Sequence, residues 1–141
     1  IVSFMQKNVA FCNIDQPVLG QSLSPTQYVT SGIGYVRLHG RNYDQWFESD
    51  NRDDRYNYLY KESELRDWKS KIDEVAGKAT TTYVITNNHF EGKAGVNALE
   101  LKALLSGKRV TAPPSLIKSY PELRKFADPL QDEDPNFSLL A

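Results

Sequence analysis

The strongest periodic signal in the sequence is an amphipathic pattern over residues 62–76. Its apolar side chains recur at intervals of three and four, the spacing of one helix face: Leu65, Trp68, Ile72, Val75 and Ala76. Strand-like segments flank it, since residues 35–40 alternate strictly and residues 80–87 are rich in β-branched side chains. A helix between two strands is typical of parallel pairing, because parallel strands need a long crossover. The pattern therefore predicts an α/β protein with a mainly parallel sheet.

Two further segments extend this alternation. Residues 9–15 form a short apolar run that ends in a carboxylate and predicts a buried strand. Residues 93–106 predict a second helix, with an apolar stripe made of Ala94, Ala98, Leu101 and Leu105. Gly77 and Gly107 are expected to end the two helices. Loops are predicted at 17–34 and 41–60, and a short helix near 119–127.

The composition excludes several classes of protein. With 40% hydrophobic and 25% charged residues in 141, the chain is neither disordered nor collagen-like. Its net charge of −1 gives no reason to expect nucleic acid or a membrane surface as a partner. A single cysteine, Cys12, excludes a disulfide framework and any multi-cysteine metal site. No apolar run approaches ~18 residues and no signal-peptide pattern opens the chain, so a cytoplasmic location is expected.

Polar side chains follow each predicted strand, where α/β sheets and barrels bind their ligands. They are Asp15 after the first strand, His39, Arg41 and Asn42 after the second, and Asn87, Asn88 and His89 after the third. Both histidines of the chain lie at such ends. We therefore take His39, His89 and Asp15 as the candidate catalytic residues, with the histidines as acid or base.

Two arginines of the second strand region have different expected roles. Arg37 alternates with Val36 and Leu38 and so points to the other face of the sheet or into a barrel interior. A guanidinium there needs a carboxylate, and Asp15 is a candidate partner, which leaves a structural pair and ligand binding both open. Arg41 lies just beyond the strand, where its planar fork suits a phosphate or carboxylate group.

The third strand end leads directly into a helix through residues 88–93. Free backbone amides and the positive helix end converge near Gly92, beside Lys93, which suits an anion. The alternative is structural, with Asn88 as a helix cap in a tight turn.

Two alternatives to anion binding remain open. Asp15, His39 and His89 together offer one carboxylate and two imidazoles, a ligand set for zinc, iron or manganese in a hydrolase or isomerase, although no spacing motif enforces it. A non-enzymatic module would instead use the aromatic segment 43–60, including Trp46 and Phe47, to contact a partner. The sequence identifies no cofactor.

Several blocks of the sequence resemble one known family in order and spacing. They are Tyr-Val-Arg-Leu-His-Gly-Arg-Asn at 35–42, Tyr-Asn-Tyr-Leu-Tyr at 56–60, Glu-Leu-Arg-Asp-Trp at 64–68, Asn-Asn-His-Phe-Glu-Gly-Lys-Ala at 87–94, Asn-Ala-Leu-Glu-Leu-Lys at 97–102 and Ala-Pro-Pro at 112–114. The chain resembles the YecE-like family, domain-of-unknown-function family 72, over residues 9–127. The resemblance implies a TIM-type barrel and supplies no reaction, because the family's activity is not established.

The resemblance also implies which part of a barrel this is. The blocks match the end of a barrel of ~250 residues, so residues 1–127 are expected to form the C-terminal portion of one TIM-like (β/α)8 domain, with residues 128–141 as an acidic, flexible tail. The expected partners are then the missing barrel half or a second copy of the chain. Late barrel strands often bind phosphate. The leading hypothesis is binding or processing of a small phosphorylated or otherwise anionic metabolite.

Overall fold

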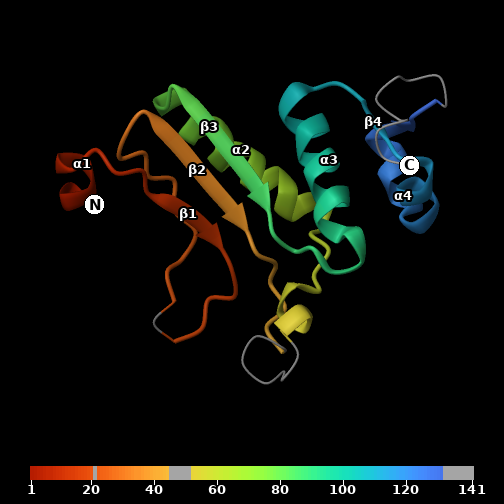
Figure 1. Cartoon of the computed structure of the whole chain (residues 1–141), viewed down its shortest axis with the longest axis horizontal. Coiled ribbons are helices and arrows are strands. Elements are labelled where there is room, and N and C mark those ends of the chain that lie inside the picture. The colour runs from red at the N-terminus through yellow and green to blue at the C-terminus, as the bar shows by residue number, and fades with distance from the viewer. Residues whose placement is uncertain (21, 45–51, 132–141) are drawn as a thin grey trace.

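The computed structural model describes residues 1–20, 22–44 and 52–131 of the chain. Its main sheet has three parallel strands in the order β1 (Cys12–Asp15), β2 (Ile33–Leu38) and β3 (Thr81–Thr86) (Figure 1). Asp15 lies beside Leu38, and Leu38 beside Thr86, so the carboxyl ends of all three strands share one edge. The predicted α/β class with parallel strands is confirmed.

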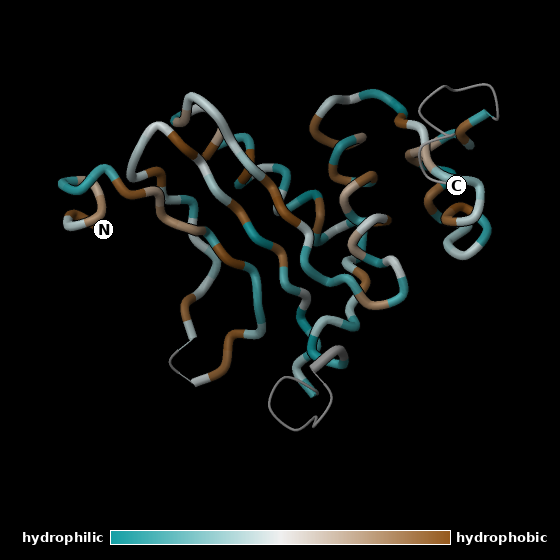
Figure 2. Tube along the Cα trace, viewed as in Figure 1, coloured by the Kyte–Doolittle hydropathy of each residue, from teal (hydrophilic) through white to brown (hydrophobic). Residues whose placement is uncertain are grey.

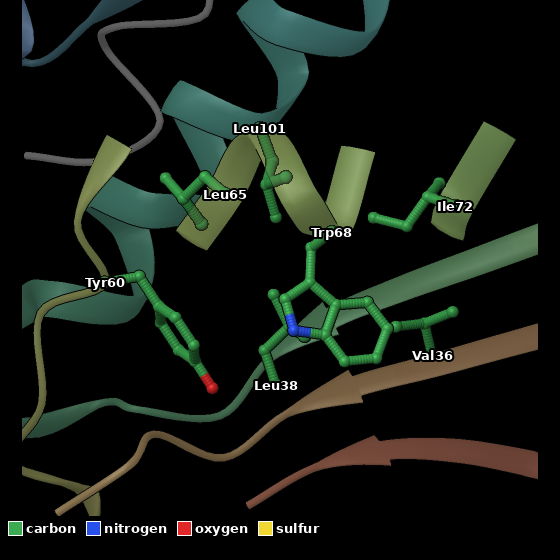
Figure 3. Packing of buried hydrophobic residues seen from close by; sticks show 7 residues of the cluster. All are labelled: Val36, Leu38, Tyr60, Leu65, Trp68, Ile72 and Leu101. Carbon is green, nitrogen blue, oxygen red and sulfur yellow. The ribbon is translucent and has the colours of Figure 1, made fainter. Parts of the chain in front are cut away.

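Helix α2 (Glu62–Lys78) connects β2 to β3 and covers one face of the sheet. Its Leu65, Trp68 and Ile72 are buried against Val36 and Leu38, and Figure 3 shows the Trp68 indole between the helix and β2. Removal of these apolar side chains from water holds the helix on the sheet. The predicted helix is confirmed, but its end at Gly77 is wrong. Gly77 is exposed within the last turn, and the extended backbone of Ala79 ends the helix.

Helix α3 (Lys93–Ser106) follows β3 through a short 3-10 turn, η2 (Phe90–Gly92). Gly107 ends it in the left-handed conformation, with φ of 66°, as predicted. The predicted apolar stripe is partly wrong, because Ala98 is exposed and Asn97 and Glu100 are buried. Since α3 packs against α2 on one side and the C-terminal strands on another, its buried surface includes polar positions that a single apolar stripe would not contain.

The C-terminal region forms a second small unit. Strands β4 (Val110–Ala112) and β5 (Ala127–Pro129) pair in parallel, and between them lie α4 (Pro114–Ser119) and η3 (Pro121–Lys125). The helix predicted near 119–127 is therefore divided at Tyr120–Pro121. Asp128 and Pro129 belong to β5 rather than to the expected tail, and residues 132–141 lie outside the described residues. Strands β4 and β5 and helix α4 were not predicted, and neither were two short elements earlier in the chain, α1 (Val2–Gln6) and η1 (Arg52–Tyr56).

Of the described residues, the helices α2 and α3 pack on the first face of the main sheet and leave the second face uncovered. Ile14, Arg37 and Ile85 lie side by side on it, because they are register partners that alternate with the buried row. Tyr83 and Ile85 are 53% and 39% exposed. Polar residues follow the end of β2, and the tube in Figure 2 takes the teal colour of hydrophilic residues there. In the described ranges we find no helix with the length and apolar character to cross a membrane.

Candidate functional site at the carboxyl edge of the sheet

Polar side chains at the carboxyl edge of the sheet form two groups on opposite faces. The first group, the buried anchor, consists of Asp15, Arg41, Tyr58, Tyr60 and Glu64 on the side of α2. The second group, the strand-end cluster, lies at the end of the open face and consists of Arg37, His39, Tyr56, Asn87 and His89.

Asp15 is the centre of the buried anchor. Its carboxylate is fully buried and accepts hydrogen bonds from Arg41 Nε at 2.9 Å and Arg41 Nη2 at 3.0 Å. The Tyr60 hydroxyl donates to Asp15 at 2.5 Å and accepts the Gly40 amide at 2.8 Å. Glu64 accepts a hydrogen bond from Arg41 Nη1 at 3.0 Å. These donors compensate for the removal of the carboxylate from water.

Arg41, Tyr58 and Tyr60 of the anchor keep their protons at neutral pH, because the pKa of each is raised. Burial alone would lower the pKa of Arg41, but the hydrogen bond and charge of Asp15, with the charge of Glu64, raise it above its ordinary value. Burial and then the Asp15 charge raise the pKa of Tyr60, and burial with Glu64 raises the pKa of Tyr58 to about 12. Arg41 is therefore a cation shared by two carboxylates, an arrangement that suits a structural role.

The expected pairing of Asp15 with Arg37 is wrong. Asp15 shares a face with Leu38, whereas Arg37 lies on the opposite face, because neighbouring residues of a strand alternate. Arg41 reaches Asp15 from the loop beyond β2 and takes the place of that partner.

Asn87 is the centre of the strand-end cluster. Its Oδ1 accepts a hydrogen bond from Arg37 Nη2 at 3.2 Å, and its Nδ2 lies 3.2 Å from His39 Nδ1. Its backbone carbonyl accepts a hydrogen bond from His89 Nδ1 at 3.1 Å. The Tyr56 ring lies near both imidazoles, with centroids 6.0 Å from His39 and 5.1 Å from His89. The fold thus brings both histidines to one place.

Arg37 is a cation of this cluster that no carboxylate in the described part of the chain neutralises. Among the described residues none of its nitrogens lies within ion-pair distance of an acid, and its only hydrogen bond is to the neutral Asn87. Its Nε is shielded from solvent and has no partner in the described ranges, whereas Nη1 is not among the shielded atoms. A buried N–H without an acceptor costs about 1–3 kcal/mol, so this guanidinium has unused donor capacity.

The start of α3 is occupied by the chain's own groups. Lys93 Nζ donates to Asn57 Oδ1 at 2.6 Å and to Glu91 Oε2 at 3.0 Å. The N-cap position of α3 is Gly92, and Asn88 does not cap the helix, so that structural alternative is wrong. Asn88 is buried and donates to Tyr58 O and Asn97 Oδ1.

Asn42 has a similar role in the loop after β2. Its side-chain amide donates to the backbone carbonyls of Asp54 at 2.8 Å and Asn57 at 3.3 Å. Asn42 and Asn88 therefore hold the backbone around the site in place.

The metal-ligand set expected as an alternative does not assemble. In the parts of the chain that the structure describes, no three His, Cys, Asp or Glu side chains lie close enough together to hold a metal ion. Asp15 is enclosed in the anchor, while His39 and His89 belong to the opposite cluster. Trp46 and Phe47, the expected partner contacts, lie outside the described residues.

A cavity of about 440 Å³ lies between β3 and α3, away from both groups. Its lining is mainly apolar, including Val84, Leu101 and Leu105. It contains no convergent set of charged groups, so we place the candidate site at the strand-end cluster.

Sequence reasoning missed three residues that hold the edge together: Tyr60, Glu64 and Asn97. One signal was available for Glu64, because its position three residues after Lys61 suits a reciprocal cap at the start of α2, and Glu64 Oε2 does accept the Lys61 amide. Tyr60 contacts Asp15, which lies 45 residues away in the sequence, and Asn97 contacts Tyr60, which lies 37 residues away. No local sequence pattern reveals contacts at such separations.

Comparison with known proteins gives matches within one family. A model of the family described as "Protein of unknown function DUF72" matches residues 2–120. The UPF0759 protein YunF of Bacillus subtilis is 33% identical over 97 residues, which are 64% of this chain and 34% of that protein.

Two solved structures give a consistent result. The structure of a DUF72 family protein from Thermotoga maritima matches this chain with a TM-score of 0.69 and 34% sequence identity. That of a DUF72 family protein from Enterococcus faecalis matches with a TM-score of 0.67 and 27% sequence identity. Each match covers 73% of this chain and 39% of the solved chain. The chain thus spans about a third of the curated relative and two-fifths of these solved relatives.

Proposed function

The chain belongs to the DUF72 family, and from that premise we propose that it binds a small anionic ligand, such as a phosphorylated metabolite, at the strand-end cluster. The family description carries no activity, so the proposal rests on the chemistry of the site.

Arg37 carries the proposal. It is a guanidinium at the carboxyl edge of a parallel sheet, its charge is not balanced by any described carboxylate, and Nη1 is not among its shielded atoms. Guanidinium groups bind phosphate and carboxylate through paired, charge-assisted hydrogen bonds. The sequence favours Arg41 as the arginine that binds the anion, but the donors of Arg41 are already paired with the carboxylates of Asp15 and Glu64.

His39 and His89 are the candidate acid and base if the ligand undergoes a reaction. Both lie against Asn87 and Tyr56, within the same cluster as Arg37. Burial and then the positive charge of Arg37 lower the pKa of His39, while Asp15 opposes this shift. An imidazole accepts a proton in its neutral form and donates one as the imidazolium, so a pair of histidines offers acid–base chemistry.

We also propose that the three-stranded sheet is part of a TIM-type barrel in the whole protein. The helices cover one face of the parallel sheet, and the opposite face carries exposed Tyr83 and Ile85. Parallel sheets are normally covered on both faces, and in a barrel the second face becomes the packed interior. Arg37 would then lie at the mouth of the barrel, where TIM barrels bind their ligands.

Titration with inorganic phosphate tests the anion proposal. We expect binding to the full-length chain, detected by calorimetry and by shifts of the His39 and His89 resonances, and a loss of affinity of tenfold or more in Arg37→Gln. The matched control is Arg66→Gln, which removes an exposed guanidinium paired with Glu62 on α2. Equal affinities for the wild type, Arg37→Gln and Arg66→Gln would refute the proposal.

A further inference from the structure

We infer that Asn87 is a positioning residue that holds His39 as a neutral Nε2–H donor next to Arg37, so that the site binds the unprotonated oxygens of an oxyanion, which can only accept hydrogen bonds. The ligand class rests on the proposed function, whereas the role of Asn87 stands on hydrogen-bond geometry alone.

Arg37 determines the orientation of the Asn87 amide. A guanidinium has donors and no acceptor, so the Asn87 atom that faces Arg37 Nη2 at 3.2 Å must be the carbonyl oxygen. The NH₂ group of the same amide then faces His39 Nδ1, also at 3.2 Å. Because this NH₂ group can only donate, Nδ1 must accept with its lone pair.

This chain of contacts selects one form of His39. An imidazole that accepts at Nδ1 carries its proton at Nε2, and it is neutral. In an imidazolium, the Nδ1–H of His39 would face the NH₂ group of Asn87, and both groups are donors. If the Asn87 amide rotated so that its oxygen faced His39, its NH₂ group would instead face the donors of the Arg37 guanidinium. Either arrangement leaves donors facing each other, which costs about the desolvation free energy of an unpaired polar group.

The charged groups around His39 agree with this assignment. Arg37 on β2 and the burial of the ring lower the pKa of His39, and Asp15 at the end of β1 raises it less. The ring of Tyr56, the last residue of η1, lies 6.0 Å from the His39 ring, and His89 contacts the same Tyr56 ring and the Asn87 carbonyl. Asp15 is itself paired with the Arg41 guanidinium, whose positive charge opposes the effect of the carboxylate on His39.

The consequence concerns which ligand group can bind. Arg37 and His39 Nε2 then present donors only, and a neutral His39 adds no second full charge. A phosphate or carboxylate oxygen satisfies such donors, whereas an ammonium group or a bare metal cation would meet them with like polarity.

Nitrogen-15 NMR of the ligand-free, full-length protein at pH 7 tests the role of Asn87 without any ligand. We expect a proton on His39 Nε2 and none on Nδ1. Asn87→Asp should reverse this, because a carboxylate can accept from both Arg37 and His39. The variant should place a proton on His39 Nδ1, raise the pKa of His39, and weaken phosphate binding by tenfold or more. Asn8→Asp is the matched control, since it makes the same charge change at an exposed position near the other end of the sheet.

The outcomes separate the two proposals. A wild-type His39 protonated at Nδ1 would overturn the role of Asn87, and that spectrum is decisive even if Asn87→Asp does not fold. An Asn87→Asp protein with an unchanged His39 tautomer would overturn it as well. The expected tautomers without phosphate binding would support the role of Asn87 and refute the ligand class together with the proposed function.

Discussion

Glu100 is a charged residue that the fold buries almost completely, with only 6% of its surface exposed. Asp15, the other buried acid among the described residues, is bound by a guanidinium, whereas Glu100 accepts a hydrogen bond from the neutral amide of Asn97 at 2.7 Å. Burial raises the pKa of Glu100 to about 7, Glu122 and Glu62 add to the shift, and Lys125 opposes it. The protonation of one residue is thereby coupled to the stability of the folded chain.

Glu100→Gln should remove a pH dependence of stability. The pKa of Glu100 in the folded state lies above its ordinary value of 4.5, so between pH 4.5 and about 7 the folded chain binds more protons than the unfolded chain. The free energy of unfolding therefore falls as the pH rises towards 7. The slope is at most about 1.4 kcal/mol per pH unit. Urea denaturation from pH 5 to 8 should show this slope in the wild type, and the glutamine variant should lack it and be the more stable protein at pH 8.

The exposed Glu122 provides a control for this measurement, since Glu122→Gln should retain most of the slope. Identical pH profiles for Glu100→Gln and the wild type would show that Glu100 is not the titrating group.

At the scale of elements, the contact between β2 and α2 is set by one glycine. A Cβ atom at Gly34 would lie 2.5 Å from Val75 Cγ1 and 2.7 Å from Thr82 Oγ1. Both distances are shorter than any normal contact, so the strand, the helix or β3 would have to shift. The small residue therefore allows the close packing that buries Val36 and Leu38 beneath the helix.

Gly34→Ala should lower the free energy of unfolding by about 1–3 kcal/mol, the usual cost of overpacking a core. Gly32→Ala is the matched control, because its nearest contact would be 3.5 Å from Thr80 Oγ1 and Gly32 is exposed. Chemical denaturation of both variants gives the comparison. Equal free energies of unfolding for the two variants would contradict the prediction, because they would show that β2 and α2 can move apart to accept a methyl group at residue 34 without loss of stability.

At the scale of the whole molecule, Asn97 links parts that are distant in the sequence. Its Oδ1 accepts from the Tyr60 amide at 3.0 Å and from Asn88 Nδ2 at 2.8 Å. Its Nδ2 donates to Glu100 and to the Tyr60 carbonyl. The residue thus joins α3 to the segment before α2 and to the end of β3, next to both candidate groups.

Asn97→Ala should lower the free energy of unfolding by about 2 kcal/mol or more, because it leaves the buried amides of Tyr60 and Asn88 without an acceptor. Hydrogen exchange of the Tyr60 amide should accelerate in the same variant. Lys102→Ala removes an exposed side chain from the same helix and should change neither quantity. Unchanged Tyr60 exchange in Asn97→Ala would contradict the proposed link.

Local patterns in the sequence were sufficient for the elements of the main sheet. The period of Leu65, Trp68 and Ile72 predicts α2 because one apolar face must leave water, and the alternation of Val36 with Arg37 predicts which side of β2 is buried. The same alternation placed Arg37 on the face opposite the helices, and the carboxyl edge was correctly expected to collect both histidines.

The pairing of charges at that edge was decided by the tertiary structure. Arg41, rather than Arg37, reaches Asp15, and Tyr60 completes that contact from 45 residues away. The burial of Asn97 and Glu100 likewise depends on the second layer that packs against α3. The sequence by itself determined the strands of the main sheet and the helices α2 and α3, because helix and strand periodicity act between near neighbours. Only the tertiary structure decided which polar groups are neutralised and which, like Arg37, keep donors without a partner among the described residues, because hydrogen bonds join residues by their positions in space.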